Sequence, residues 1–115
     1  MAKIDYVVEW FFPQADLADH RVQSHYSDHW TPCGCQWLVQ YSPQIAKCVM
    51  LMSLRDGPEA TIEDLQVALN DVVAGRLVLL AEDGVMGPKT VSRLKTILES
   101  LEDAEVEILR ILSEF

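Results

Sequence analysis

Residues 61–75, TIEDLQVALNDVVAG, contain the clearest secondary-structure signal in this chain. The apolar side chains of the stretch recur at the three- and four-residue spacing of one helical face. They are Ile62, Leu65, Leu69 and Val72. Thr61, with Asp64 three residues later, is typical of a helix start, and Gly75 stands where a glycine often follows a helix. We therefore predict a helix that begins at Thr61 and ends before Gly75.

A second helical pattern begins at Thr90 and extends to the end of the chain. Its apolar residues follow a seven-residue repeat that only Glu105 interrupts. They are Val91, Leu94, Leu98, Leu101, Ile108, Leu112 and Phe115. An unbroken helix over 90–114 would be about 37 Å long, which is more than a domain of this size can cover. The helix should therefore break near Ser100, which together with Asp103 could cap a second helix, or present its apolar stripe to a partner.

The first half of the chain has the composition of strands. Residues 4–12 are rich in β-branched and aromatic side chains and end at Pro13, and residues 35–41 alternate in the period of a half-buried strand. Ser42-Pro43 is compatible with a turn before a strand over 46–54, or with the cap and first position of a helix that ends at Asp56-Gly57. We favour the strand, because a hairpin would give residues 4–12 a sheet to join.

These elements predict a single α+β domain over residues 1–115. A small antiparallel N-terminal sheet within the strand-rich part, 1–57, would pack on two or three C-terminal helices in the helical part, 58–115. The length of 115 residues, of which 50% are hydrophobic, allows an ordinary core and excludes intrinsic disorder.

The net charge of the chain limits the classes of function that it can have. Nine basic and eighteen acidic residues give a net charge of -9, and residues 58–115 alone, with five basic and twelve acidic residues, contribute -7. Direct nucleic-acid binding is therefore not expected. No secretion signal or membrane span is apparent, and three cysteines, an odd number, fit a reducing compartment. We expect a cytoplasmic protein, in the host cytoplasm if a phage encodes it.

The most specific string in the chain is DGVMGPKT, residues 83–90. Gly84 and Gly87 can adopt positive φ, Pro88 fixes the chain before a helix, and Thr90 can supply a capping oxygen. This combination predicts a tight turn that leads into the last helical segment.

The same string resembles the D-G-x-x-G-P-x-T signature of the peptidoglycan-binding domain family, small helical modules found on phage endolysins, muramidases and amidases. Upstream, Leu65-Gln66 and Ala68-Leu69-Asn70 are similar to the L-Q-x-x-L-N start of that module, so the resemblance covers residues 61–98. It implies a shallow groove for carbohydrate or stem peptide beside the loop, in which no bond is made or broken. The ligand-binding residues that it implies are Asp83, Gly84, Gly87 and Thr90.

Four side chains within eleven residues have the chemistry of zinc ligands: His25, His29, Cys33 and Cys35. Their spacing lacks the paired blocks of common zinc fingers, so we favour buried cysteines and surface histidines, with no metal and no other cofactor. A thiol nucleophile with a histidine base would lack a third orienting group. We therefore expect no enzymatic activity.

Two functions from different classes remain. The first is a small acidic interaction protein that blocks a basic site on a partner protein, as phage-encoded inhibitors of host defence and toxin-immunity proteins do. Its partner-binding residues would be Glu99, Glu102, Asp103, Glu105, Glu107 and Phe115, and the same apolar stripe could form a homodimer. The alternative is a peptidoglycan-binding module of a phage or bacterial lytic system. We favour the first narrowly, because it accounts for the whole chain.

Overall fold

The computed structural model describes residues 5–115, and every regular element in that part of the chain is a helix. In chain order the elements are α1 (Tyr6–Phe11), α2 (His20–His25), the π-helical turn η1 (Tyr26–Trp30), α3 (Cys35–Tyr41), α4 (Pro43–Asp56), α5 (Pro58–Val73), α6 (Pro88–Ser100) and α7 (Ala104–Leu112). The predicted α+β fold with an antiparallel sheet is therefore wrong.

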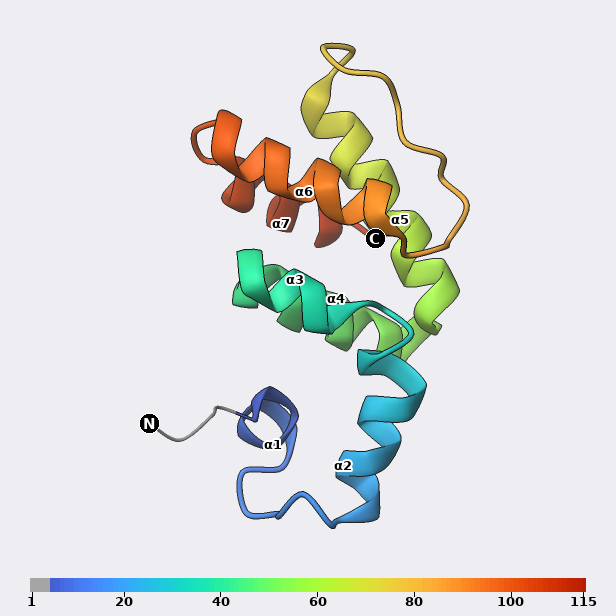
Figure 1. Ribbon diagram of the computed structural model, residues 1–115, viewed down its shortest axis with the longest axis vertical. Helices are drawn as coiled ribbons and strands as arrows, with labels where there is room; N and C mark the ends of the chain where they lie inside the picture. Colours follow the sequence, from blue (N-terminus) through green and yellow to red (C-terminus); the bar gives the residue numbers. More distant parts are fainter. Residues whose placement is uncertain (1–4) are drawn as a thin grey trace.

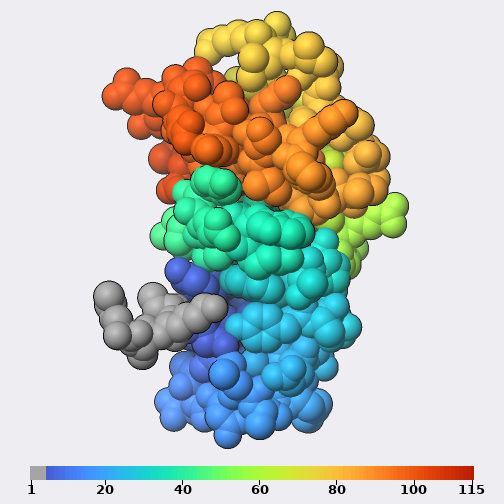
Figure 2. Space-filling model, viewed as in Figure 1, coloured from blue at the N-terminus to red at the C-terminus, as the bar shows by residue number. Residues whose placement is uncertain are grey.

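Helices α4 and α5 organise the molecule, which measures 45 × 30 × 25 Å. Helix α4 contacts η1, α3, α5 and α7, and α5 also contacts α6 and α7. Figure 1 shows the pair α6 and α7 above the pair α3 and α4, with α1 and α2 at the opposite end of the molecule. In Figure 2 the C-terminal helices lie directly on the α3–α4 layer.

The predicted strand over 4–12 is wrong, because residues 6–11 of it form helix α1, with Asp5 and Phe12 as its caps. Residue 4 lies outside the described residues. The Asp5 carboxylate caps α1 by accepting a hydrogen bond from the Val8 N–H at 3.0 Å, and it also accepts one from the Tyr26 hydroxyl at 2.6 Å. A capping carboxylate at this position satisfies backbone donors that a strand would leave to a neighbouring strand. The apolar composition of residues 4–12 alone did not reveal this helix cap.

The predicted strand over 35–41 is helix α3. Gly34, at φ +70°, turns the chain into this helix. The buried residues are Cys35 and Leu38, three apart, while Trp37 and Tyr41 are exposed. The alternation in the sequence was therefore misleading, because burial follows the helical period.

The predicted strand over 46–54 is part of helix α4, so the helix alternative at Ser42-Pro43 is correct. The Ser42 hydroxyl accepts a hydrogen bond from the Ile45 N–H at 3.0 Å, and Pro43 occupies the first helical position. The same hydroxyl donates to Glu105 Oε2 of α7 at 2.7 Å. One buried side chain thus caps α4 and joins it to the last helix.

The helices predicted in the second half are confirmed, but two of them begin earlier in the chain than predicted. Helix α5 begins at Pro58, so Thr61 is a buried residue within it, and α6 begins at Pro88, so Thr90 does not cap it. The last helical segment breaks after Ser100, as the first of the two alternatives predicted. The capping expected from Ser100 and Asp103 is wrong, because α7 begins at Ala104 without a side-chain cap. Among residues 5–115, no helix has the length and apolar character needed to cross a membrane.

We expect Ser42→Ala to lower the free energy of unfolding by about 1–3 kcal/mol, because it removes the α4 cap and leaves Glu105 without its hydroxyl partner. Denaturant unfolding followed by circular dichroism measures this. Ser113→Ala is the control, since Ser113 is exposed beyond the end of α7 and should change the stability by less than about 0.5 kcal/mol. Equal effects of the two substitutions would contradict the assigned role of Ser42.

Candidate functional site

The side chain of Gln66, buried on α5, holds the loop that follows this helix. Its amide nitrogen donates to Asp83 Oδ1 at 3.1 Å, to the Val85 carbonyl at 3.0 Å and to Thr90 Oγ1 at 3.2 Å. Its amide oxygen accepts from the Gly84 N–H at 3.0 Å. A single side chain therefore fixes both the turn at Asp83–Val85 and the first turn of α6.

Asn70, one helical turn further along α5, holds the loop at a second point. Its side-chain oxygen accepts from the Leu80 N–H at 2.7 Å, and its nitrogen donates to the Leu80 carbonyl at 3.0 Å and to Glu82 Oε2 at 2.9 Å. Side chains four residues apart share one face of a helix. Gln66 and Asn70 therefore act together as two clamps on one long loop, which Figure 1 shows running from the end of α5 to the start of α6.

The two glycines of the DGVMGPKT string differ in conformation. Gly84 is buried at φ +72°, and a Cβ atom there would lie 2.8 Å from the Glu59 carbonyl oxygen. Gly87 has φ -139°, an extended conformation, with open space where a Cβ would be. The expected positive φ is therefore correct for Gly84 and wrong for Gly87.

Of the predicted ligand-binding residues, three take part in the clamp. Gly84 and Thr90 are buried against Gln66, whereas Asp83 is exposed. Hydrogen bonds from the Val85 N–H and from Gln66 hold the pKa of Asp83 below its ordinary value, so this carboxylate stays ionised at neutral pH. These residues shape the loop through contacts within the chain.

A groove of about 1140 Å³ lies between this loop and α6. One wall is the loop segment 77–81, and the other is formed by α6. The groove is lined by Gln66, Leu77, Val78, Leu79, Leu80, Ala81, Asp83, Val85, Gly87, Pro88, Lys89, Thr90, Ser92, Arg93 and Thr96. The predicted loop thus borders this groove.

The loop wall of the groove is unusually apolar for a protein surface. Val78 is 85% exposed and Leu79 is 62% exposed, and Leu77 and Val85 are exposed beside them. Contiguous exposed apolar side chains typically mark a binding surface. The hydrogen bonds between Asn70 and the backbone of Leu80 fix the end of this wall. The apolar side chains before Leu80 therefore stay exposed to solvent.

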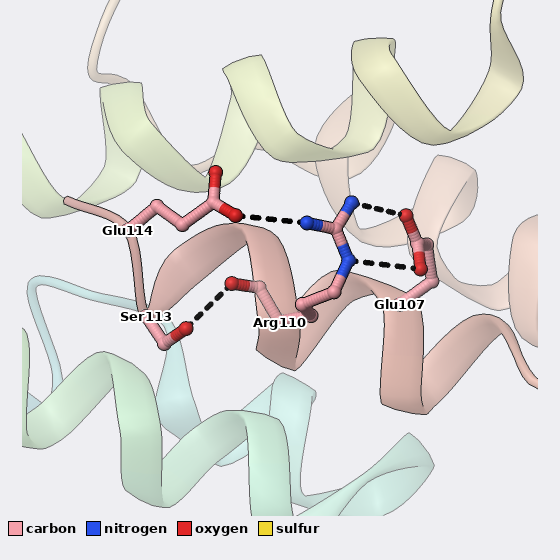
Figure 3. Close-up of polar contacts among 4 residues, drawn as sticks. All are labelled: Glu107, Arg110, Ser113 and Glu114. Atoms are coloured by element: carbon pink, nitrogen blue, oxygen red, sulfur yellow. Dashed lines mark hydrogen bonds and ion pairs between the residues drawn. The ribbon is translucent and has the colours of Figure 1, made fainter.

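The predicted partner-binding residues do not form one free surface. Glu107 and Glu114 both form ion pairs with Arg110 of α7, as Figure 3 shows. The hydrogen bond from Arg110 lowers the pKa of the Glu107 carboxyl. Glu105 accepts the Ser42 hydrogen bond described above. The other named residues, Glu99, Glu102, Asp103 and Phe115, are exposed. Of the five acidic residues assigned to a partner, Glu105 and Glu107 therefore make contacts within the chain.

The apolar stripe of the last helix is covered by the rest of the molecule. Ala104, Ile108, Ile111 and Leu112 are buried, and α7 contacts α4, α5 and α6. The prediction of a homodimer depended on this stripe being available to a second copy. Only Val106 and Phe115 remain as exposed large apolar residues beyond Ser100.

The four candidate zinc ligands do not converge, and no group of three histidine, cysteine or acidic side chains in residues 5–115 is arranged to hold a metal ion. The ring of His25 packs against Phe12 at 4.8 Å between ring centroids, and burial lowers the pKa of this histidine. His29 Nδ1 lies 2.6 Å from the Ser53 hydroxyl oxygen. Cys33 and Cys35 are buried together, and their contact lowers the pKa of Cys33 and raises that of Cys35.

Comparisons with known proteins give no assignment for this chain. A scan against models of protein families found no match, and a search of curated proteins found no relative.

The sequence did not point to several residues that build the groove. Lys89, Arg93 and the apolar run at 77–80 are not among the predicted site residues. The usable signal was the LVLL run at 77–80, which lies between Gly75 and the Asp83-Gly84 turn and so is too short and isolated for a core element.

We expect Gln66→Glu to destabilise the protein by roughly 2–4 kcal/mol at neutral pH, because a buried carboxylate would face the acceptors that the amide now bonds. Burial raises the folded-state pKa of the introduced acid above its unfolded value of about 4.3. The deficit should thus be small below about pH 4 and grow as the pH rises above it. Denaturant unfolding against pH, with exposed Glu63→Gln as the control, measures this, and a deficit independent of pH would contradict it.

We expect Gly84→Ala to destabilise the protein by about 1–3 kcal/mol, since alanine at positive φ is strained and its Cβ meets the Glu59 backbone. Gly87→Ala should change the stability by less than about 0.5 kcal/mol, because its backbone suits any residue. Thermal unfolding of both variants provides the measurement. Equal losses would show that the difference in φ has no energetic consequence.

Proposed function

We propose that this protein is a non-catalytic binding module whose ligand is peptidoglycan, held in the groove between residues 77–87 and α6. The single observation that supports this most is the clamp on α5. Gln66 and Asn70, from the stretch that resembles the start of the peptidoglycan-binding module, hold the loop that carries the D-G-x-x-G-P-x-T string. The clamp keeps an apolar wall exposed beside the groove.

The alternative, an acidic protein that blocks a basic site, has less support from the geometry. Glu105, Glu107 and Glu114 make contacts within the chain, and the apolar stripe that would anchor a partner is buried. Within residues 5–115, in contrast, the groove is open to solvent beside exposed apolar side chains. We therefore place the function at the groove.

A sedimentation assay with purified insoluble sacculi tests the proposal. We expect the wild-type protein to pellet with sacculi, and Val78→Asp to reduce the bound fraction by about tenfold, since a charge would replace an exposed apolar contact in the groove wall. Val106→Asp is the matched control, because Val106 is also an exposed valine, at 66%, but lies on α7 outside the groove. It should bind like the wild type.

Two results would contradict the proposal. Wild-type protein that stays in the supernatant at every sacculus concentration would exclude wall binding. Equal losses for Val78→Asp and Val106→Asp would place the binding surface elsewhere. Melting curves of both variants establish that each is folded in the assay.

A further inference from the structure

Helix α6 has its charged residues in the order opposite to the one that stabilises an isolated helix. Its first turn contains Lys89 and no acidic residue, and its last turn contains Glu99 and no basic residue. The N-terminus of a helix favours negative side chains and the C-terminus favours positive ones, so this order is unfavourable within one chain. Both side chains are exposed, and within residues 5–115 neither forms an ion pair. Contacts inside the chain therefore do not account for these two charges.

The surface of α6 changes in character along the helix, which lies on the outside of the molecule in orange in Figure 2. Lys89 and Arg93 lie in its first half, and Glu99 lies near its end. On the side that borders the groove, the exposed residues between these ends are small, Ser92 and Thr96. Small side chains allow a second helix to pack closely. The charges of this surface are complementary to those of the same surface in the reverse direction.

The apolar surface beside α6 also has two different ends. Val78 and Leu79 are exposed beside the groove, which residues 88–96 of the chain help to line. A smaller hollow of about 170 Å³ lies beside the second half of α6, and Thr96 lines both hollows. The apolar residues that line the smaller hollow are Val73, Leu77, Ile97 and Leu101. Exposed apolar side chains at one end of this face therefore match an apolar hollow at the other end.

A face with complementary ends fits a second copy of itself, because a two-fold axis sets each end against the opposite end of the other copy. We propose that the protein forms a homodimer through this face, with the two α6 helices antiparallel and Thr96 near the two-fold axis. Lys89 and Arg93 of each copy then face Glu99 of the other copy. Val78 of each copy meets the smaller hollow of the other.

This dimer is separate from the one that the sequence predicted through the apolar stripe of α7, because that stripe is buried. It also goes beyond the proposed function. The second copy would cover the groove, so self-association and sacculus binding would compete for one face. Association measured without sacculi tests the dimer alone, and its failure would leave the proposed function standing. A dimer that forms normally while the protein ignores sacculi would overturn wall binding alone.

Sedimentation equilibrium of the full chain, from low to high micromolar concentration, tests the dimer. We expect the wild type to dimerise. Lys89→Glu and Glu99→Lys should each raise the dimer dissociation constant by about tenfold, since the two-fold axis makes one reversal into two repulsive contacts. Both reversals suit the helix dipole, so both variants should remain folded, which circular dichroism verifies. A wild type that is strictly monomeric at high micromolar concentration would overturn the proposal.

Lys47→Glu is the matched control, because Lys47 is also an exposed lysine but lies on α4, outside both hollows. It changes the net charge as much as Lys89→Glu does, and should change the dissociation constant by less than about twofold. Glu99→Lys lowers the magnitude of the net charge of -9, so general repulsion alone would make its dimer tighter. A tighter Glu99→Lys dimer, or equal weakening by Lys47→Glu and Lys89→Glu, would overturn the proposal.

A mixture of the two α6 variants tests whether the charges pair between copies. In a mixed dimer of Lys89→Glu with Glu99→Lys, each changed residue faces an opposite charge again. An equimolar mixture should therefore dimerise about as tightly as the wild type, although each variant alone does not. A mixture that associates as weakly as its components would show that the substitutions act within each chain, and would overturn the proposal.

Discussion

The hydrogen bonds of Gln66 are the interaction on which the second half of the structure depends. One buried amide forms hydrogen bonds with the turn at Asp83–Val85 and with the hydroxyl of Thr90. These bonds attach both the end of the loop and the start of α6 to α5. Because a buried amide without partners is costly, the loop and the side chain stabilise each other. The position of α6, and hence one wall of the groove, follows from this contact.

The groove exists because the loop is fixed without being buried. Asn70 bonds both backbone groups of Leu80, and this prevents the apolar segment before it from collapsing onto the core. Exposed apolar surface is unfavourable in isolation, so its retention is understandable if a ligand covers it. In this respect the loop differs from α7, whose apolar residues are all turned inward except Val106.

The N-terminal third supports the rest through a separate set of contacts. The rings of Tyr6, Trp10 and Trp30 lie within 6.1 Å of one another, and the Asp5 carboxylate joins α1 to η1 through the Tyr26 hydroxyl. Gly34, where a Cβ would meet the Met86 side chain, connects this part to the clamped loop. Tyr6, Trp10 and Trp30 thus belong to one core between helices, whereas Trp37 and Tyr41 are exposed.

The sequence by itself determined the helices of the second half, because their apolar residues keep a helical period over many turns and end at glycine or at a polar break. It also identified the turn at Asp83-Gly84, since few residues suit its geometry. Only the tertiary structure decided the first half, where capping by Asp5 and Ser42 and packing against α4 made helices from short segments rich in strand-forming residues. The groove could not be derived from the sequence for the same reason. Its walls, 77–81 and α6, are brought together by side chains of α5 that lie up to 24 residues away in the chain.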